Sequence, residues 1–166
     1  LDITGGSAGV AGWETADESH DYYGSGDIDA DAARLAREAV RKADDEMDYS
    51  EYDNDGDGVV DGVIVVHQGA GEEASGDPDD IWSHRWSFTG AGLDAYQTDD
   101  GVAVNSYSLQ PETYRSGITT VGVVAHETGH LFGMTDLYDT TYRSEGIGDW
   151  GLMGGGSWNG VNRPGD

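Results

Sequence analysis

Residues 118–136 read ITTVGVVAHETGHLFGMTD, and this stretch predicts a helix that ends at a glycine. Apolar residues recur near helical spacing over 118–132, and Gly133 ends the pattern. His126 and His130 are four residues apart, so both imidazoles face the same way, with Cβ atoms about 6 Å apart. That spacing suits two nitrogen ligands on one zinc ion at about 2.0–2.1 Å. We therefore expect this helix to carry a metal site.

The residues around the two histidines predict a catalytic zinc site. Glu127 lies about 100° around the helix from His126. It therefore misses the metal itself but can reach a water on the metal and act as general base. Catalytic zinc takes three protein ligands and keeps one open position. Gly133 can adopt a positive φ and turn the chain back, which brings Asp136 within reach as the third ligand. The alternative is that these are ordinary surface or core histidines. It requires the two histidines, the Glu, the Gly and the Asp to match the pattern by chance.

Composition limits the class of protein. A chain of 166 residues suffices for one domain with a core, so we expect a single catalytic domain over 1–166. Aromatic residues make up 10% of the chain, which argues for a folded protein. There is no cysteine, so disulfides and thiolate metal sites are excluded. No run of residues is apolar enough to span a membrane.

The charge balance is strongly acidic. Asp and Glu number 33 against eight Lys and Arg, and the formal net charge is −25. This charge repels phosphate backbones, so no nucleic-acid partner is expected. We expect some carboxylates to bind metal and the others to form a hydrated, halophilic surface. Stability should then rise with salt, which screens self-repulsion.

The remaining segments predict a mixed α/β (α+β) fold. Residues 1–28 are rich in Gly, Ser and Asp and predict a loop. An amphipathic helix is expected over residues 31–47 and a buried, β-branched strand over 59–67. Further strands are expected over 81–88 and 102–109, with Pro111 ending the second.

An acidic turn precedes the first strand. It has the spacing of oxygen ligands in an EF-hand-like calcium loop, including one backbone carbonyl, at Asp53, Asp55, Asp57, Val59 and Asp61. Position 12 is Ile64 and not Glu, so the loop departs from the standard form, and Asp61 is the residue expected to close it. A structural Ca²⁺ is our interpretation, and a solvated acidic turn is the alternative.

Two segments resemble the M6 (immune inhibitor A-like) metallopeptidases, a metzincin-like group of zincins. Residues 125–139 resemble that family's zinc motif, with Asp136 as third ligand, and residues 148–160 resemble its Met-turn segment. The resemblance implies a twisted sheet packed on the active-site helix, with Met153 beneath the zinc ligands. It also implies a secreted zinc endopeptidase that hydrolyses peptide bonds of extracellular proteins.

The resemblance is looser elsewhere. Residues 52–69 and 81–86 resemble recurring family segments, whereas the chain is expected to be truncated at both ends relative to the family's domain. Several metzincins place a Tyr two residues after the Met, and here that position is Gly155, so no oxyanion side chain is assigned. The expected partner is a protein or peptide substrate, and the expected state is a monomer.

Two other functions stay open at this point. One is a calcium-stabilised binding or adhesion module whose zinc site is not catalytic, and the other is a zinc hydrolase acting on a non-peptide bond. Glu127 speaks against the first, because a closed structural site needs no base. Other polar residues carry weaker signals: we favour hydrogen-bonded histidines over metal ligands at His20, His67 and His84, and Asp139 either supports the zinc ligands or caps a turn.

Overall fold

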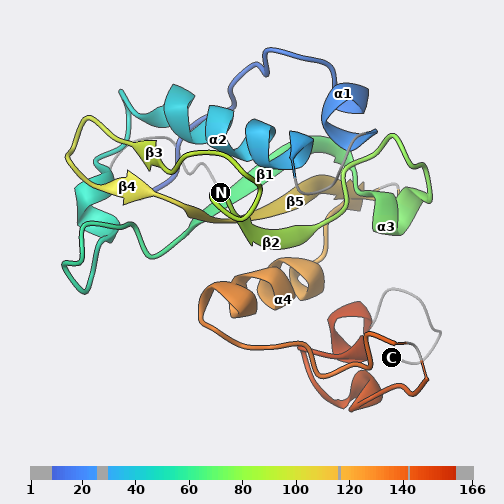
Figure 1. Cartoon of the computed structure of the whole chain (residues 1–166). Helices are drawn as coiled ribbons and strands as arrows, with labels where there is room; N and C mark the ends of the chain where they lie inside the picture. Colours follow the sequence, from blue (N-terminus) through green and yellow to red (C-terminus); the bar gives the residue numbers. More distant parts are fainter. Residues whose placement is uncertain (1–8, 26–29, 116, 142, 160–166) are drawn as a thin grey trace.

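The computed structural model describes residues 9–25, 30–115, 117–141 and 143–159. A sheet lies between two helices, with α2 (Asp31–Ala43) on one side and α4 (Val121–Leu131) on the other (Figure 1). The mixed α/β class expected from the sequence is confirmed. The far ends of the chain, including the start of the expected 1–28 loop, lie outside the described residues.

The main sheet is mixed, with the order β1-β5-β2. Its central strand is parallel to one neighbour and antiparallel to the other, and its far end pairs with a short fourth strand: β1 (Val63–Ala70), β5 (Ser106–Tyr114), β2 (His84–Ser87) and β6 (Gly117–Ile118). A separate antiparallel pair consists of β3 (Tyr96–Gln97) and β4 (Ala103–Val104).

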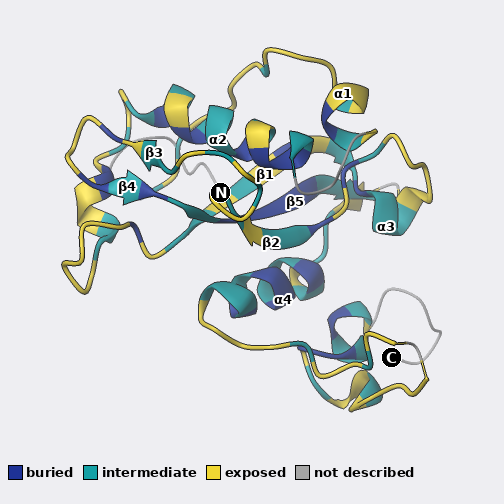
Figure 2. Cartoon of the chain, viewed as in Figure 1, coloured by how far each residue is buried: buried dark blue, intermediate teal, exposed yellow. Residues whose placement is uncertain are grey.

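The hydrophobic core fills the space between α2 and the sheet, as the dark residues there show (Figure 2). The helix meets the sheet through the small side chains of Ala32, Ala33 and Ala36, which are all nearly inaccessible. Phe88 and Tyr107 stack with ring centroids 5.2 Å apart in this layer. Burial of this apolar surface is the main stabilising contribution to the sheet.

The N-terminal half departs from the expected elements in two places. A short helix, α1 (His20–Gly24), lies where a loop was expected. Its Tyr23 is buried and donates a hydrogen bond to Glu38 of α2 at 2.7 Å, so tertiary contacts impose a turn of helix on a polar segment. Helix α2 also ends at Ala43, four residues before the expected end, with Met47 in the turn that follows.

Several strand boundaries also differ from the expected ones. Strand β1 begins at Val63 and extends to Ala70. The strand expected over 81–88 is shorter and covers only His84–Ser87. The expected 102–109 strand divides into β4 and β5, and Pro111 does not end it. Pairing with β2 stops at Leu109, so Pro111 lies where that edge of β5 needs no backbone donor. A one-turn helix, α3 (Glu72–Ser75), follows β1.

Helix α4 begins at Val121, because Gly117 and Ile118 pair with β5 instead. Its buried face carries Val123, His126, Glu127 and Gly129, whereas Val121 and Phe132 are each 80% exposed. The two ends of the expected apolar pattern are therefore exposed, and the polar side chains of His126 and Glu127 lie on the buried face. The segment beyond α4 is irregular, with two short 3-10 helices, η2 (Gly148–Trp150) and η3 (Gly155–Trp158). Among the described residues, no helix is both long and apolar enough to cross a membrane.

Candidate metal centre

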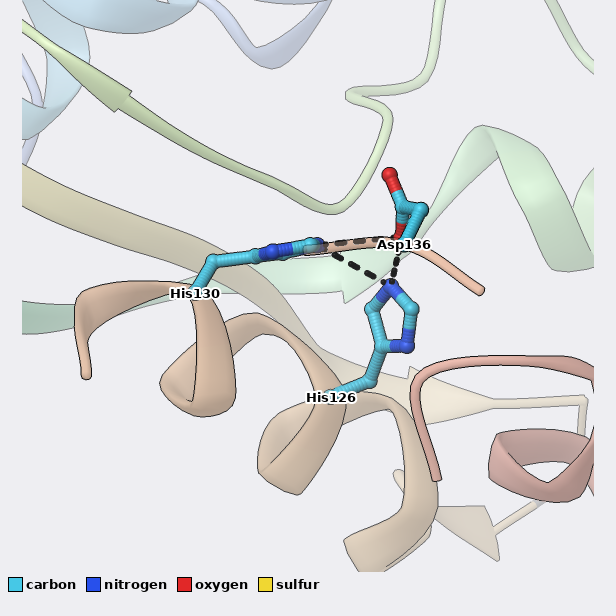
Figure 3. Close-up of side chains that lie close together, drawn as sticks. All are labelled: His126, His130 and Asp136. Atoms are coloured by element: carbon cyan, nitrogen blue, oxygen red, sulfur yellow. Dashed lines mark hydrogen bonds and ion pairs between the residues drawn. The ribbon is translucent and has the colours of Figure 1, made fainter. Parts of the chain in front are cut away.

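Three side chains converge at the C-terminal end of α4 (Figure 3). His126 Nε2 and His130 Nε2 are 3.2 Å apart. Asp136 Oδ1 lies 3.2 Å from the first nitrogen and 3.3 Å from the second. Ligand atoms around a tetrahedral zinc ion at about 2.0–2.1 Å are roughly 3.3 Å from one another. The triangle therefore has the dimensions of one face of a zinc coordination sphere.

Hydrogen bonds set the tautomers of both imidazoles. His126 Nδ1 is 2.9 Å from the Leu152 carbonyl oxygen, and His130 Nδ1 is 2.8 Å from that of Met134. A carbonyl only accepts, so each Nδ1 carries the hydrogen and each Nε2 presents a lone pair. Asp136 Oδ1 is buried and has no hydrogen-bond partner. Three lone pairs facing one another are repulsive without a cation, so the residues fit a bound metal.

The chain turns back after α4 at Gly133, which has a φ of 81°. Leu137 then ties the returning segment to the segment around Met153, since its N–H donates to the Met153 carbonyl at 2.7 Å. The Met153 side chain is buried beside α4, where a Cβ added at Gly129 would come within 2.8 Å of its sulfur. Met153 therefore packs against the turn of α4 that carries His130.

Glu127 stands next to the triangle without belonging to it. Its Oε1 is 4.0 Å from His126 Nε2, and the residue is only 9% exposed. Burial raises the pKa of this carboxyl, and the Asp136 and Glu73 carboxylates raise it further, whereas His126 and His130 lower it. A buried carboxyl is thus a stronger base than an exposed one, which suits the role of a general base.

Comparison with known proteins decides the family. A model of the Immune inhibitor A peptidase M6 catalytic domain matches residues 3–166. The chain belongs to this M6 peptidase family. It is 33% identical over 190 residues to the pre-pro-metalloprotease PrtV of Vibrio cholerae, covering 93% of this chain and 20% of that protein. It is 36% identical over 152 residues to Immune inhibitor A of Bacillus thuringiensis subsp. alesti, covering 76% and 21%. The chain thus spans about a fifth of these relatives' length.

Two residues of this M6 domain lie near the centre without having been predicted. Glu73 of α3 contributes to the electrostatics of Glu127, and its carboxylate accepts hydrogen bonds from the Ser83 N–H and hydroxyl. The Tyr138 ring lies 6.3 Å from that of His126, at an interplanar angle of 20°. Tyr138 follows Asp136 by two residues, a spacing that in an extended segment places both side chains on one side. Nothing local in the sequence signals Glu73.

The acidic loop of the M6 chain gathers some of its expected ligands. Asp53, Asp55 and Asp57 each offer a carboxylate oxygen within 4.8 Å of the others. Asp61 lies outside that group, and its Oδ2 accepts a hydrogen bond from the Asn54 side chain at 2.5 Å. The Val59 N–H donates to Asp57 Oδ1 at 2.8 Å. The three aspartates are therefore the expected ligands that the structure brings together.

Two of the polar residues with weaker signals, His84 and Asp139, have ordinary hydrogen-bond partners. His84 Nδ1 is 2.7 Å from the Trp82 carbonyl, and its Nε2 is 3.0 Å from the Tyr107 hydroxyl, as expected of a hydrogen-bonded histidine. Asp139 caps a turn, because its carboxylate accepts from the Thr141 N–H at 2.9 Å and from the Arg143 N–H at 3.2 Å. These hydrogen bonds of Asp139 are to its own turn and not to His126, His130 or Asp136.

Proposed function

We propose that this M6 domain is a zinc-dependent endopeptidase with a metzincin-like zincin fold, in which water hydrolyses a peptide bond. The observation that carries the proposal is the triangle of His126, His130 and Asp136 with the Glu127 carboxyl beside it. A structural zinc site has no use for a buried carboxyl at its open side. The relative named as a metalloprotease supports the same activity.

The residues divide the chemistry between them. His126, His130 and Asp136 would hold the zinc ion, which when bound polarises the scissile carbonyl and lowers the pKa of a water to about 7. Glu127 accepts the proton of the attacking water and then delivers it to the departing amine. Burial raises the pKa of the Glu127 carboxyl, which makes it a better acceptor of the proton that it takes from water.

The support around the ligands keeps the site in order. The Leu152 and Met134 carbonyls hold the two imidazoles in the tautomer that presents Nε2. The Leu137–Met153 backbone hydrogen bond fixes the segment that presents Asp136. Met153 packs against Gly129 of α4, and this contact helps to fix the helix that carries His126 and His130.

Glu127→Gln tests the proposal, with Glu46→Gln, an exposed residue in the turn after α2, as a matched control. Glutamine keeps the shape of the side chain and cannot take the proton. We expect zinc content to stay at the level of the unmodified protein while casein cleavage falls about 10²–10⁴-fold, the usual contribution of a general base. The control should cleave normally. Undiminished cleavage by Glu127→Gln would contradict the role of Glu127 as general base. Absence of casein cleavage by the zinc-loaded unmodified protein would instead favour a binding module with a non-catalytic zinc.

We further propose that the loop of Asp53, Asp55 and Asp57 binds a structural Ca²⁺, with the Val59 carbonyl and Asp61 completing the ligands. The clustered carboxylates support this, because Ca²⁺ takes six to eight oxygens. The loop leads into β1, so the ion would brace the edge of the sheet. EGTA should lower the melting temperature of the protein and leave that of an Asp53→Asn/Asp55→Asn variant unchanged. An equal response of the two proteins would contradict the site.

We also propose that the enzyme is a secreted monomer that acts on extracellular proteins. Family membership and the net charge of −25 support this, since such a charge favours a dispersed, hydrated molecule. Immunodetection in culture medium and in cells, together with light scattering of the purified protein, tests both statements. Protein confined to cells or a stable dimer would contradict the respective statement.

A further inference from the structure

A second pair of histidines, His20 and His67, lies apart from the metal centre. His67 is the fifth residue of β1, on the face of Val63 and Val65, which pack against the core under α2. His20 begins α1, which packs on the same helix. In Figure 1, α1 and α2 lie on one side of the sheet and α4 on the other.

Both rings are held by acceptors on Nδ1. His67 Nδ1 is 3.0 Å from the Gln68 carbonyl oxygen, and His20 Nδ1 is 3.5 Å from Asp80 Oδ1. These acceptors favour the hydrogen on Nδ1, so each neutral ring presents a lone pair at Nε2. Burial lowers the pKa of His67 to about 4, so that ring is neutral at physiological pH.

Both Nε2 atoms are buried and have no hydrogen-bond partner. His67 is only 5% exposed, and a buried polar atom without a partner is uncommon and costly. A carboxylate or carbonyl behind each imidazole and a bare lone pair in front of it is the arrangement that metal-binding histidines show. His126 and His130 have that same arrangement in this chain.

The geometry of the pair suits one shared ion. The ring centroids are 5.4 Å apart with an interplanar angle of 49°, against 4.8 Å for His126 and His130. Two imidazoles that direct Nε2 at one zinc at about 2.0–2.1 Å have centroids roughly 5 Å apart. His20 Nε2 also points at β1 near His67, because a Cβ built at Gly69 would lie 3.8 Å from it.

We propose that His20 and His67 form a second site for a zinc-class transition-metal ion, with Asp80 holding His20 in place. Two imidazole nitrogens favour ions such as Zn²⁺, Ni²⁺ or Cu²⁺ over Ca²⁺, which prefers oxygen. Both residues also line a hollow of about 1110 Å³ between the N-terminal segment, α2 and β1, which offers an ion a path toward the pair. The ion would tie α1 to the edge of the sheet.

Zinc stoichiometry tests the site in a protein whose catalytic ligands are removed. A His126→Gln/His130→Gln variant is dialysed against buffered micromolar zinc, with millimolar calcium to occupy the carboxylates at Asp53–Asp57. Mass spectrometry of the metals should find one zinc per chain. Adding His67→Gln should remove it, whereas adding His84→Gln, the hydrogen-bonded histidine of β2, should not.

His20→Gln guards against loss of folding, because His20 lies on a short surface helix and its side chain is 24% exposed. In the His126→Gln/His130→Gln background, zinc should raise the melting temperature, and adding His20→Gln should abolish that rise while the circular dichroism spectrum stays unchanged. Two results would overturn the proposal. One is a folded background protein that takes up no zinc; the other is full zinc uptake after both His20 and His67 are replaced.

Discussion

The two sides of the molecule are held together by different means. The sheet half, α1 to β5, contains the whole hydrophobic core cluster, from Tyr23 to Leu109. In the site half, which we define as 121–159, the described buried apolar side chains are Val123 and Met153. Large apolar side chains there are exposed instead, with Trp150 at 96% and Phe132 at 80%.

The site half relies on close backbone packing and on its charged centre. A Cβ added at Gly122 of α4 would lie 2.0 Å from the Ser157 carbonyl oxygen, so the helix and η3 meet backbone to backbone. With little apolar burial, we expect the free energy of metal binding to be a large part of what orders this half. The comparison teaches that the hydrophobic core lies in the sheet half, whereas the candidate site lies in the half with little core of its own.

Removal of the metal should produce the largest difference in behaviour between the two halves. At free zinc of about 1,000 times Kd, binding stabilises the folded protein by roughly 4 kcal/mol. Stripping zinc with a chelator should therefore abolish proteolysis and speed hydrogen exchange in 121–159, while the amides of β1 and β5 keep their protection. Hydrogen exchange followed by mass spectrometry gives the result by segment. Equal loss of protection in both halves would break the comparison.

Replacing a single ligand should come next in size. Asp136→Asn removes the charge that faces the two imidazole lone pairs, so zinc affinity should fall by more than about 100-fold, the upper end for outer-shell partners. Asp139→Asn is the matched control, because the Asp139 carboxylate accepts hydrogen bonds from Thr141 and Arg143 of its own turn. Competition with a fluorescent zinc chelator measures both. Similar affinities in the two variants would rule out Asp136 as a ligand.

The sheet half should respond to pH through His67. Burial lowers the pKa of this imidazole from 6.5 to about 4, so the unfolded chain binds the extra proton first as pH falls. Its stabilising contribution is complete above pH 6.5 and is lost as pH falls toward 4, by roughly 2 kcal/mol between pH 7 and 5. Urea unfolding of the metal-free protein should show this slope. His67→Gln should flatten it, and an unchanged slope would assign the effect to other groups.

Salt should have the smallest effect and should not distinguish the halves. With a net charge of −25, self-repulsion weakens as the screening length falls from about 10 Å at 0.1 M to 3 Å at 1 M. The melting temperature should rise by a few degrees between these NaCl concentrations. A fall would remove the basis for calling the surface halophilic.

The metal centre was accessible from the sequence because its parts are local. Ten residues separate His126 from Asp136, one helix period aligns the histidines, and Gly133 supplies the only sharp turn needed between them. The class of fold followed from the apolar periods of α2 and β1. These features depend on neighbours along the chain, where spacing determines geometry.

The sequence did not predict features that depend on tertiary packing. The extension of β5 past Pro111 requires knowing that β2 stops pairing at Leu109. The approach of Glu73 to Glu127, and of His20 to His67, joins residues far apart in the chain. The burial of His126 and Glu127 on α4 likewise depends on the segments that pack against the helix, which apolar spacing along the chain does not give.

A crystal structure of the protein grown with zinc, with anomalous data at the zinc edge, tests the central claim most directly. The account predicts a peak about 2.0–2.2 Å from His126 Nε2, His130 Nε2 and an Asp136 oxygen, with water at the remaining position and Glu127 beside it. An active protein whose zinc lies elsewhere, or whose Asp136 points away from that ion, would contradict it.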